Sequence, residues 1–178
     1  MSGARRIIVG ASGSPGSLQA LRFAADLARD DDATLIPVLA WLPPGGDQAD
    51  RRQPSLYLRR IWKEAAWQRL WDALDRAWGG LPEDLTAAPT VQRGEAGHVL
   101  VAAACRTRDL LVVGAGRRGA LRHLFGCRVS HYCLAHAHCP VVAVPPADLA
   151  QEAARRLGSR MFFRRALSPG RMAMPPAG

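Results

Sequence analysis

The chain has no long apolar run, almost no lysine and no closely paired cysteines, and each absence excludes a class of protein. No stretch of about 18 apolar residues occurs, so we expect no transmembrane segment. The N-terminal sequence MSGARRIIVG has no long apolar segment followed by a small-residue cleavage site, so we expect a cytoplasmic protein rather than a secreted one. The four cysteines form no Cys-x-x-Cys pair, and the cytosol would keep them reduced.

Because Lys63 is the single lysine, arginine carries nearly all of the formal net charge of +9. A GC-rich genome produces this bias as readily as selection for guanidinium chemistry does. The aromatic residues are not interleaved with the arginines, as they are in proteins that bind single strands. We therefore do not expect nucleic acid to be the main partner.

The 178 residues are 48% apolar, which fits one globular domain, residues 1–146, followed by a tail. Apolar runs predict strands over Arg5–Gly10, Ala33–Trp41, Leu110–Val113 and Pro140–Val144, and a further short strand is predicted over Pro89–Gly94. Helical spacing predicts a helix from an N-cap at Ser17 to Arg29, and further helices over Ser55–Trp78, Ala96–Arg106 and Val129–Ala137. This alternation predicts an α/β fold with a parallel sheet covered on both faces.

Two features disturb the simple alternation. Pro37 lies within the second predicted strand, where it cannot donate to a ladder, so we expect a bulge or a local gap in pairing. Leu42–Pro54 is rich in proline, glycine and aspartate and is predicted to be a loop.

The longest predicted helix carries Trp67, Trp71, Leu74 and Trp78 on one face and ends at Gly79. A tryptophan stripe at this spacing is typical of a core or subunit interface. The alternative is a face that stacks on a ligand or binds a partner.

The composition changes at Ala147, and residues 147–178 contain six arginines against two acidic residues. This Arg-rich extension is predicted to be a solvated, disordered tail. The alternatives are a helix that packs on the domain or a partner, and an anchor to an anionic surface.

The stretch Asp109–Ser130 combines a buried strand with a glycine-rich loop. Gly114, Gly116 and Gly119 permit close backbone approach, and Arg117 lies between them. A loop of this kind, at the carboxyl end of a parallel strand and before a helix, is a natural phosphate site.

Five segments in the right order carry a family resemblance: IIVGASGS, VLAW, VQRGEAGHVL, DLLVVGAG and LAHAHCPVVAV. From Arg5 to Val144 the chain resembles the universal stress protein family. The resemblance implies a doubly wound, five-stranded parallel sheet of order 3-2-1-4-5, the adenine nucleotide alpha hydrolase-like fold. It also implies a homodimer formed through the last strand, at Val141, Val142 and Val144.

The resemblance further implies a site for ATP or another adenine nucleotide where the first and fourth strands diverge. Its residues here would be Gly10, Ala11, Ser12, Val38, Gly114, Gly116, Arg117, Gly119, Gly126, Arg128, Val129 and Ser130. The adenine would lie near Ala11, Ser12 and Val38, and the phosphates at the loop from Gly114 to Ser130. No metal is expected other than Mg²⁺ accompanying the nucleotide.

The phosphate signature of the nucleotide-binding members, G-x2-G-x9-G-[ST], is only partly present. Gly114 matches its first glycine, but Arg117 replaces the second, and Cys127-Arg128 replaces the final Gly-Ser pair. One hypothesis is that arginines now hold the phosphates through bidentate contacts. The alternative is a degenerate site in a family member that acts as a protein-interaction module.

Other motifs point less clearly to chemistry. Gly114, Gly116 and Gly119 also fit the G-x-G-x-x-G fingerprint, but they follow the fourth strand and lack the acidic residue that a dinucleotide site needs. Ser12 and Ser14 have no evident His or Asp partners. We therefore expect no enzyme: the predicted protein is a stress-response regulatory module without significant catalysis.

Histidines and cysteines that could in principle bind a metal ion are clustered before and after the point where the last predicted helix ends: His131, Cys133, His136, His138 and Cys139. On a helix these side chains do not converge on one ion, so we interpret the cluster as structural rather than as a metal site. Cys127 is interpreted as a buried, inert thiol, or alternatively as a redox-sensitive one whose pKa Arg128 lowers.

Overall fold

The computed structural model describes residues 5–52, 54–115 and 126–146. In chain order its elements are β1 (Arg6–Gly10), α1 (Pro15–Asp30), β2 (Thr34–Trp41), α2 (Gly46–Arg52), α3 (Leu56–Trp78), β3 (Thr90–Arg93), α4 (Ala96–Ala103), β4 (Leu110–Gly114), α5 (Gly126–His136) and β5 (Val141–Val144). The predicted extension, residues 147–178, lies outside the described residues. None of the helices in these ranges combines the length and hydrophobicity needed to cross a bilayer.

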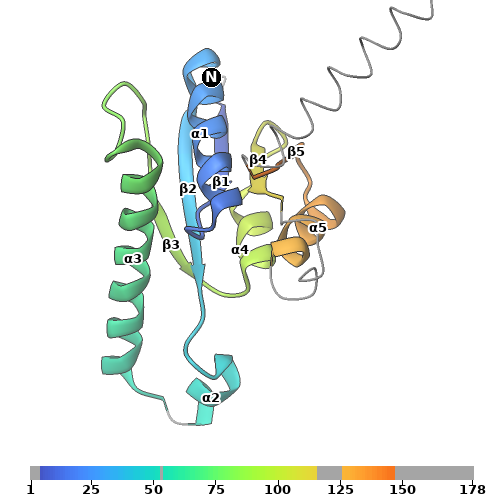
Figure 1. Ribbon diagram of the computed structural model, residues 1–178. Helices are drawn as coiled ribbons and strands as arrows, with labels where there is room; N and C mark the ends of the chain where they lie inside the picture. The colour runs from blue at the N-terminus through green and yellow to red at the C-terminus, as the bar shows by residue number, and fades with distance from the viewer. Residues whose placement is uncertain (1–4, 53, 116–125, 147–178) are drawn as a thin grey trace, which may run out of the picture. The chain divides into compact units, whose positions relative to one another are not determined.

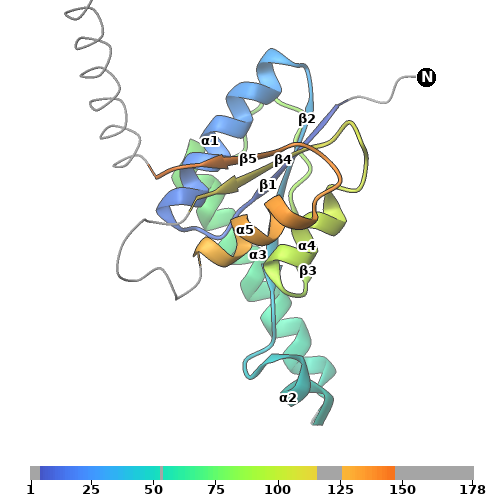
Figure 2. The ribbon, with the colours of Figure 1, turned by 90° about the vertical axis from the view of Figure 1, so that its right-hand side faces the viewer.

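The five strands form one parallel sheet in the order β3-β2-β1-β4-β5, which confirms the predicted fold. After β3 the chain crosses to the far side of β1, so the strand order reverses between β1 and β4. Helices α1 and α3 cover one face of the sheet, and α4 and α5 cover the other (Figures 1 and 2).

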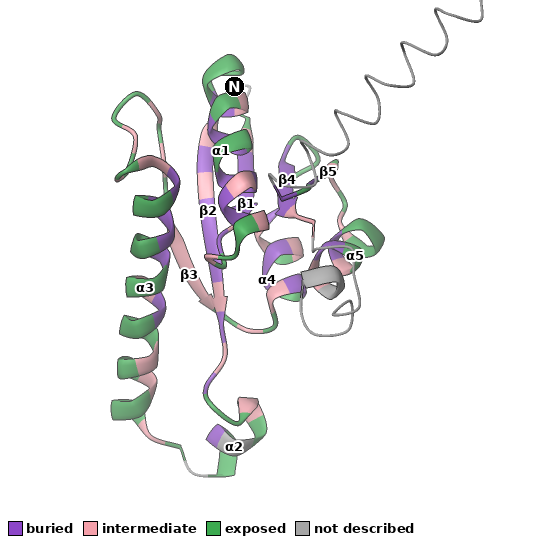
Figure 3. Cartoon of the chain, viewed as in Figure 1, coloured by how far each residue is buried: buried purple, intermediate pink, exposed green. Residues whose placement is uncertain are grey.

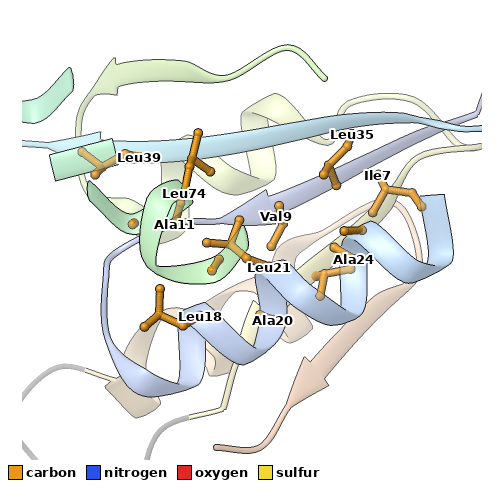
Figure 4. Packing of buried hydrophobic residues seen from close by; sticks show 14 of the residues in the cluster. Ile7, Val9, Ala11, Leu18, Ala20, Leu21, Ala24, Leu35, Leu39 and Leu74 are labelled. Carbon is orange, nitrogen blue, oxygen red and sulfur yellow. The ribbon is translucent and has the colours of Figure 1, made fainter. Parts of the chain in front are cut away.

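Each face of the sheet has its own apolar core. Ile7 and Val9 of β1 pack with Leu21 of α1 (Figure 4), whereas Ile8 joins the core beneath α4 and α5. All four side chains are fully buried. Burying one such side chain stabilises a fold by about 1.5–3 kcal/mol. Because both faces are covered, the central strands β1 and β4 contain continuous apolar runs, and this made them predictable.

The first helix begins earlier than predicted, because Ser14 and not Ser17 is its N-cap. The Ser14 hydroxyl accepts a hydrogen bond from the Ser17 amide at 3.3 Å. Pro15 is the first helical residue, where its missing N–H leaves no donor unpaired. Ser17 itself is buried, and its hydroxyl donates to the Ser14 carbonyl oxygen at 3.0 Å.

Pro37 causes a local gap in pairing and no bulge. On the β1 side of β2 the register is unbroken. On the β3 side an isolated bridge joins Leu35 to Ala87, and pairing resumes at Val38 opposite Thr90 with the same offset. Backbone groups of alternate residues point to the same side of a strand, so the missing N–H of Pro37 faces this gap.

The segment Leu42–Pro54, predicted to be a loop, contains the helix α2. Asp50 of α2 has a side chain only 1% exposed, and it accepts hydrogen bonds from Arg59 of α3 and Arg93 of β3, both at 2.8 Å. The Arg59 guanidinium lowers the pKa of Asp50 by more than burial raises it. These partners come from other segments, so local composition could not reveal the helix.

Helix α3 turns mainly leucine and alanine toward the core: Ala66, Leu70, Ala73, Leu74 and Ala77. Of the predicted stripe, Leu74 is buried, Trp67 and Trp78 are half-buried, and Trp71 is 45% exposed. The stripe therefore belongs only partly to the core, and its role as a subunit interface stays a prediction. The side of α3 that faces away from the sheet is exposed along its length (Figure 3). Gly79 ends α3 in the left-handed conformation at φ 76°, as predicted.

Candidate functional site

A cavity of about 380 Å³ lies at the carboxyl ends of β1, β2 and β4, beside the first turns of α1 and α4. The strand order reverses between β1 and β4, and ligands of open α/β sheets bind in the crevice at this point. Its described lining comprises Gly10, Ala11, Ser12, Ser14, Ser17, Val38, Leu39, Ala40, Glu95, Ala96, Leu100, Val113, Gly114 and Val129.

Six of the residues predicted for a nucleotide site line this cavity: Gly10, Ala11, Ser12, Val38, Gly114 and Val129. Ser130 is buried in α5 and is not part of the lining. Outside the described residues lie Gly116, Arg117 and Gly119. Gly126 and Arg128 are described only as backbone at the start of α5. The structure thus brings together the residues predicted to lie near the adenine, Ala11, Ser12 and Val38. The role of the arginine loop in holding phosphates stays a prediction.

The other lining residues were missed by sequence reasoning: Ser14, Ser17, Leu39, Ala40, Glu95, Ala96, Leu100 and Val113. They lie at the carboxyl ends of β2 and β4 and at the starts of α1 and α4. The strand residues could have been found from the sequence, because the carboxyl ends of parallel strands meet at the edge of the sheet where ligands bind. For α4 the signal was Gly94, whose φ of 144° turns the chain toward the cavity directly before Glu95.

The wall formed by β1 and β2 is built from small residues and backbone. The Ala11 amide donates to the Val38 carbonyl oxygen at 2.9 Å, which continues the β1–β2 pairing beyond the end of β1. A β-carbon on Gly10 would lie 3.1 Å from Leu100 Cδ1, so glycine lets α4 approach the strand closely. The result is a mostly apolar wall without large side chains from β1.

Hydroxyl groups occupy the α1 side of the cavity. The Ser12 and Ser14 hydroxyls are 3.0 Å apart, and Ser14 also caps α1. Pro15 has no N–H, and the Ser17 amide is already bonded to Ser14. This helix start therefore offers serine hydroxyls to a ligand rather than a full set of backbone amides.

Gly114 has a packing role in addition to its place in the predicted motif. A β-carbon on Gly114 would lie 2.5 Å from the Gly16 carbonyl carbon and 2.7 Å from the Ser17 nitrogen. The new β-carbon would collide with backbone atoms of α1, which cannot rotate away as a side chain can. Glycine is therefore required for β4 to end against the first turn of α1.

Glu95 is the one ionisable side chain in the described lining. Elsewhere, the described residues contain no group of three or more His, Cys, Asp or Glu side chains that could hold a metal. In the predicted cluster, burial raises the pKa of the Cys133 thiol to about 11. The His136 ring stacks on Tyr132 with centroids 4.1 Å apart, and its Nδ1 lies 2.9 Å from the Tyr132 carbonyl oxygen.

Comparisons with known proteins agree with this architecture. A sequence model of the universal stress protein family matches residues 3–145. Universal stress protein UspA from Lactobacillus plantarum is 18% identical, with 79% of this chain and 97% of that chain covered and a TM-score of 0.59. A universal stress family protein from Burkholderia pseudomallei is 27% identical, with 83% and 99% covered and a TM-score of 0.53.

A universal stress protein solved in complex with cAMP is 22% identical, with 82% of this chain and 100% of that chain covered and a TM-score of 0.50. No curated protein sequence matches the chain.

Proposed function

Because the chain belongs to the universal stress protein family, we propose that it is a stress-response regulatory module that binds an adenine nucleotide in the cavity between β1 and β4. The observation that carries this proposal is the cavity itself. It lies at the switch point of the sheet, and six residues predicted for the nucleotide site line it. Its volume of about 380 Å³ is in the range typical of small-molecule sites.

The chemistry of the lining suits one end of a nucleotide. Val38, Leu100 and Val113 supply apolar surface for the base, and Ser12 supplies a hydroxyl for a polar edge or the ribose. The phosphates would extend toward the loop from Gly114 to Ser130, where arginines would hold them. Mg²⁺ would arrive with the nucleotide. The family relative solved with cAMP supports an adenine nucleotide as the class of ligand.

We further propose that the module does not turn its ligand over. A single carboxylate, Glu95, is the ionisable group in the described lining, and general acid–base chemistry on a phosphate needs a positioned base together with charge-stabilising groups. The proposed role is therefore regulatory binding. The proposed cellular location remains the cytoplasm.

The alternative function is that of a protein-interaction module without a ligand. The departures at Arg117, Cys127 and Arg128 favour it, because a backbone cradle for phosphate is hard to build without glycine. In either case we propose a homodimer through β5, which is an edge strand of the sheet with Ala143 exposed.

Calorimetric titration with ATP, ADP and cAMP tests the proposal. Ala40→Phe places a large ring in the cavity and should abolish binding. Ala102→Phe makes the same change on the exposed side of α4 and should leave binding intact. Arg117→Glu should weaken ATP more than cAMP, because ATP carries more phosphate charge. No heat of binding for any of the three nucleotides at millimolar concentration overturns the proposal and favours the alternative.

A further inference from the structure

The outer face of α3 carries a continuous exposed seam opposite the core. Its residues follow each other at alternating spacings of four and three, the a and d spacing of a coiled coil: Tyr57, Ile61, Glu64, Gln68, Trp71 and Asp75. All six are exposed, including the apolar groups of Tyr57 at 67%, Trp71 at 45% and Ile61 at 38%. This α3 seam is a surface that no other described part of the chain covers.

Residues 56–65, which make up most of the first half of α3, include no buried residue, since the first buried one is Ala66. In Figures 1 and 2 this half of the helix extends past the end of β3. A second helix can therefore approach the α3 seam along its length without meeting the sheet.

We propose that the α3 seam binds the same seam of a second copy of this chain, antiparallel, about a twofold axis near Ala66. Antiparallel pairing about this point sets Ile61 of one copy against Trp71 of the other, so the apolar groups meet. The same register sets Glu64 against Gln68, which can donate to the carboxylate. It also sets the Tyr57 hydroxyl against the Asp75 carboxylate.

Charge selects this arrangement over a parallel one. In a parallel pair each seam residue meets its own copy, so Glu64 would face Glu64 and Asp75 would face Asp75 across the interface. In the antiparallel pair every seam residue meets a complementary one. The Gln68 Nε2 already donates one hydrogen bond to Asp72 at 3.0 Å, and its second N–H is suited to Glu64 of the second copy.

The polar middle of the α3 seam also argues for a protein partner. Glu64 already pairs with Arg60 at 3.4 Å on the surface of α3. Lipid would cover Tyr57, Ile61 and Trp71 equally well, but it would take water from this pair and offers no hydrogen bonds to Glu64 and Gln68. A second copy satisfies both groups. This interface is separate from the β5 edge, so the two together would link β5 dimers into a larger assembly, which closes as a tetramer where the two twofold axes intersect at right angles.

The molar mass of the full chain in solution, measured by size-exclusion chromatography coupled to light scattering, tests the proposal. Ile61→Asp places a charge opposite Trp71 and should lower the molar mass to that of the assembly that β5 alone provides. Leu56→Asp is the matched control, because Leu56 is on the same helix and is 83% exposed but lies off the seam. The molar mass of the Leu56→Asp protein should equal that of the wild type. Equal masses for wild type and Ile61→Asp overturn the proposal.

Disulfide trapping tests the direction of the helices. In a Cys105→Ser background, Ile61→Cys protein mixed with Trp71→Cys protein should form a mixed dimer, and neither protein alone should crosslink at these positions. Self-crosslinking of Ile61→Cys indicates parallel pairing and contradicts the register. A third outcome is that the wild type binds anionic phospholipid vesicles, and that Ile61→Asp abolishes this binding but leaves the molar mass of the protein unchanged. This outcome overturns the proposal and indicates that a membrane, and not a second copy, covers the α3 seam.

Discussion

Gly97 of α4 lies directly against Tyr132 of α5, so closely that a β-carbon on Gly97 would stand 2.6 Å from Tyr132 Cδ1. Non-bonded carbon atoms prefer about 3.5–4.0 Å. The Tyr132 ring also contacts His98, with centroids 4.5 Å apart, and stacks on His136. The two neighbouring rings restrain Tyr132 from turning away from residue 97. The absence of a side chain at residue 97 therefore sets how closely α4 and α5 pack.

Gly97→Ala is expected to lower the free energy of unfolding by about 1–3 kcal/mol, the usual range for overpacking. Urea denaturation measures this loss. In a Tyr132→Ala background, where the ring is absent, the same substitution should be nearly neutral. Equal losses in both backgrounds would show that residue 97 matters for a reason other than this contact.

Four of the strands were predictable because each contains a short apolar run with little else to compete, whereas β3, Thr90–Arg93, has a single apolar residue. The run Leu110–Val113 is buried without interruption, and such a segment between turn residues has few alternatives. The end of α3 was equally clear, since Gly79 adopts a conformation that other residues avoid. The order of the strands was different: it came from the family resemblance, because apolar runs alone do not say which strand is a neighbour of which.

Features that depend on partners far away in the chain could not be predicted from the sequence. Helix α2 depends on Asp50 meeting arginines from α3 and β3, and nothing within Leu42–Pro54 signals those partners. The candidate site shows the same division. Ala11 and Val38 were implied by the resemblance, whereas Glu95 enters the lining only because α4 starts at the edge where β1 and β2 end.

The pairing of Asp109 with Arg6 predicts a loss of stability in acid. The Asp109 side chain is 1% exposed and accepts hydrogen bonds at 2.9 Å from Arg6 Nε and from the Arg106 amide. Burial raises the pKa of Asp109, but these donors lower it by more, so it lies below its ordinary value. The stabilisation is therefore fully present above the unfolded pKa of about 3.9 and is lost as the pH falls through the lower folded value.

Asp109→Asn should reduce the free energy of unfolding by about 1–3 kcal/mol at neutral pH, because Arg6 loses its charged partner. The difference from wild type should shrink below about pH 4, where the carboxylate of the unfolded wild type gains a proton, and should be lost at the lower pH where the folded carboxylate does so too. Urea titrations at both pH values measure it. Asp31→Asn, which breaks the exposed pair with Arg5, is the control and should change stability by less than about 1 kcal/mol. A difference for Asp109→Asn that is independent of pH contradicts the assignment.

The thiols are expected to differ sharply in reactivity. Cys133 is fully buried and burial raises its pKa to about 11, so only about 0.1% would be thiolate at pH 8 even if reagent reached it. Cys105 is exposed. Iodoacetamide followed by peptide mass spectrometry should therefore modify Cys105 quickly in the native protein and Cys133 only in denaturant. Equal rates in native buffer would mean that the core beneath α4 and α5 opens readily.

Removal of the Asp50 carboxylate should release α2 without unfolding the domain. Asp50 is the buried acid between Arg59 and Arg93, and none of the α2 side chains that the structure describes belongs to the two apolar cores. Asp50→Asn is expected to speed tryptic cleavage after Arg51 and Arg52 several-fold while the urea midpoint stays close to that of the wild type. Asp47→Asn, which removes a more exposed partner of Arg93, should have a smaller effect. Unchanged cleavage by Asp50→Asn would show that α2 is held by other contacts.

Gly114→Ala separates the packing role of this glycine from its place in the nucleotide motif. The new β-carbon would meet the backbone of Gly16 and Ser17 at 2.5–2.7 Å, so the first turn of α1 must move away from β4. Without any nucleotide, we expect a loss of about 1–3 kcal/mol in the free energy of unfolding. Gly13→Ala is the control: its φ of 77° predicts about 1 kcal/mol of backbone strain, but it has open space around it. If glycine at 114 serves a ligand alone, Gly114→Ala will be as stable as the wild type in nucleotide-free buffer and will differ only in binding.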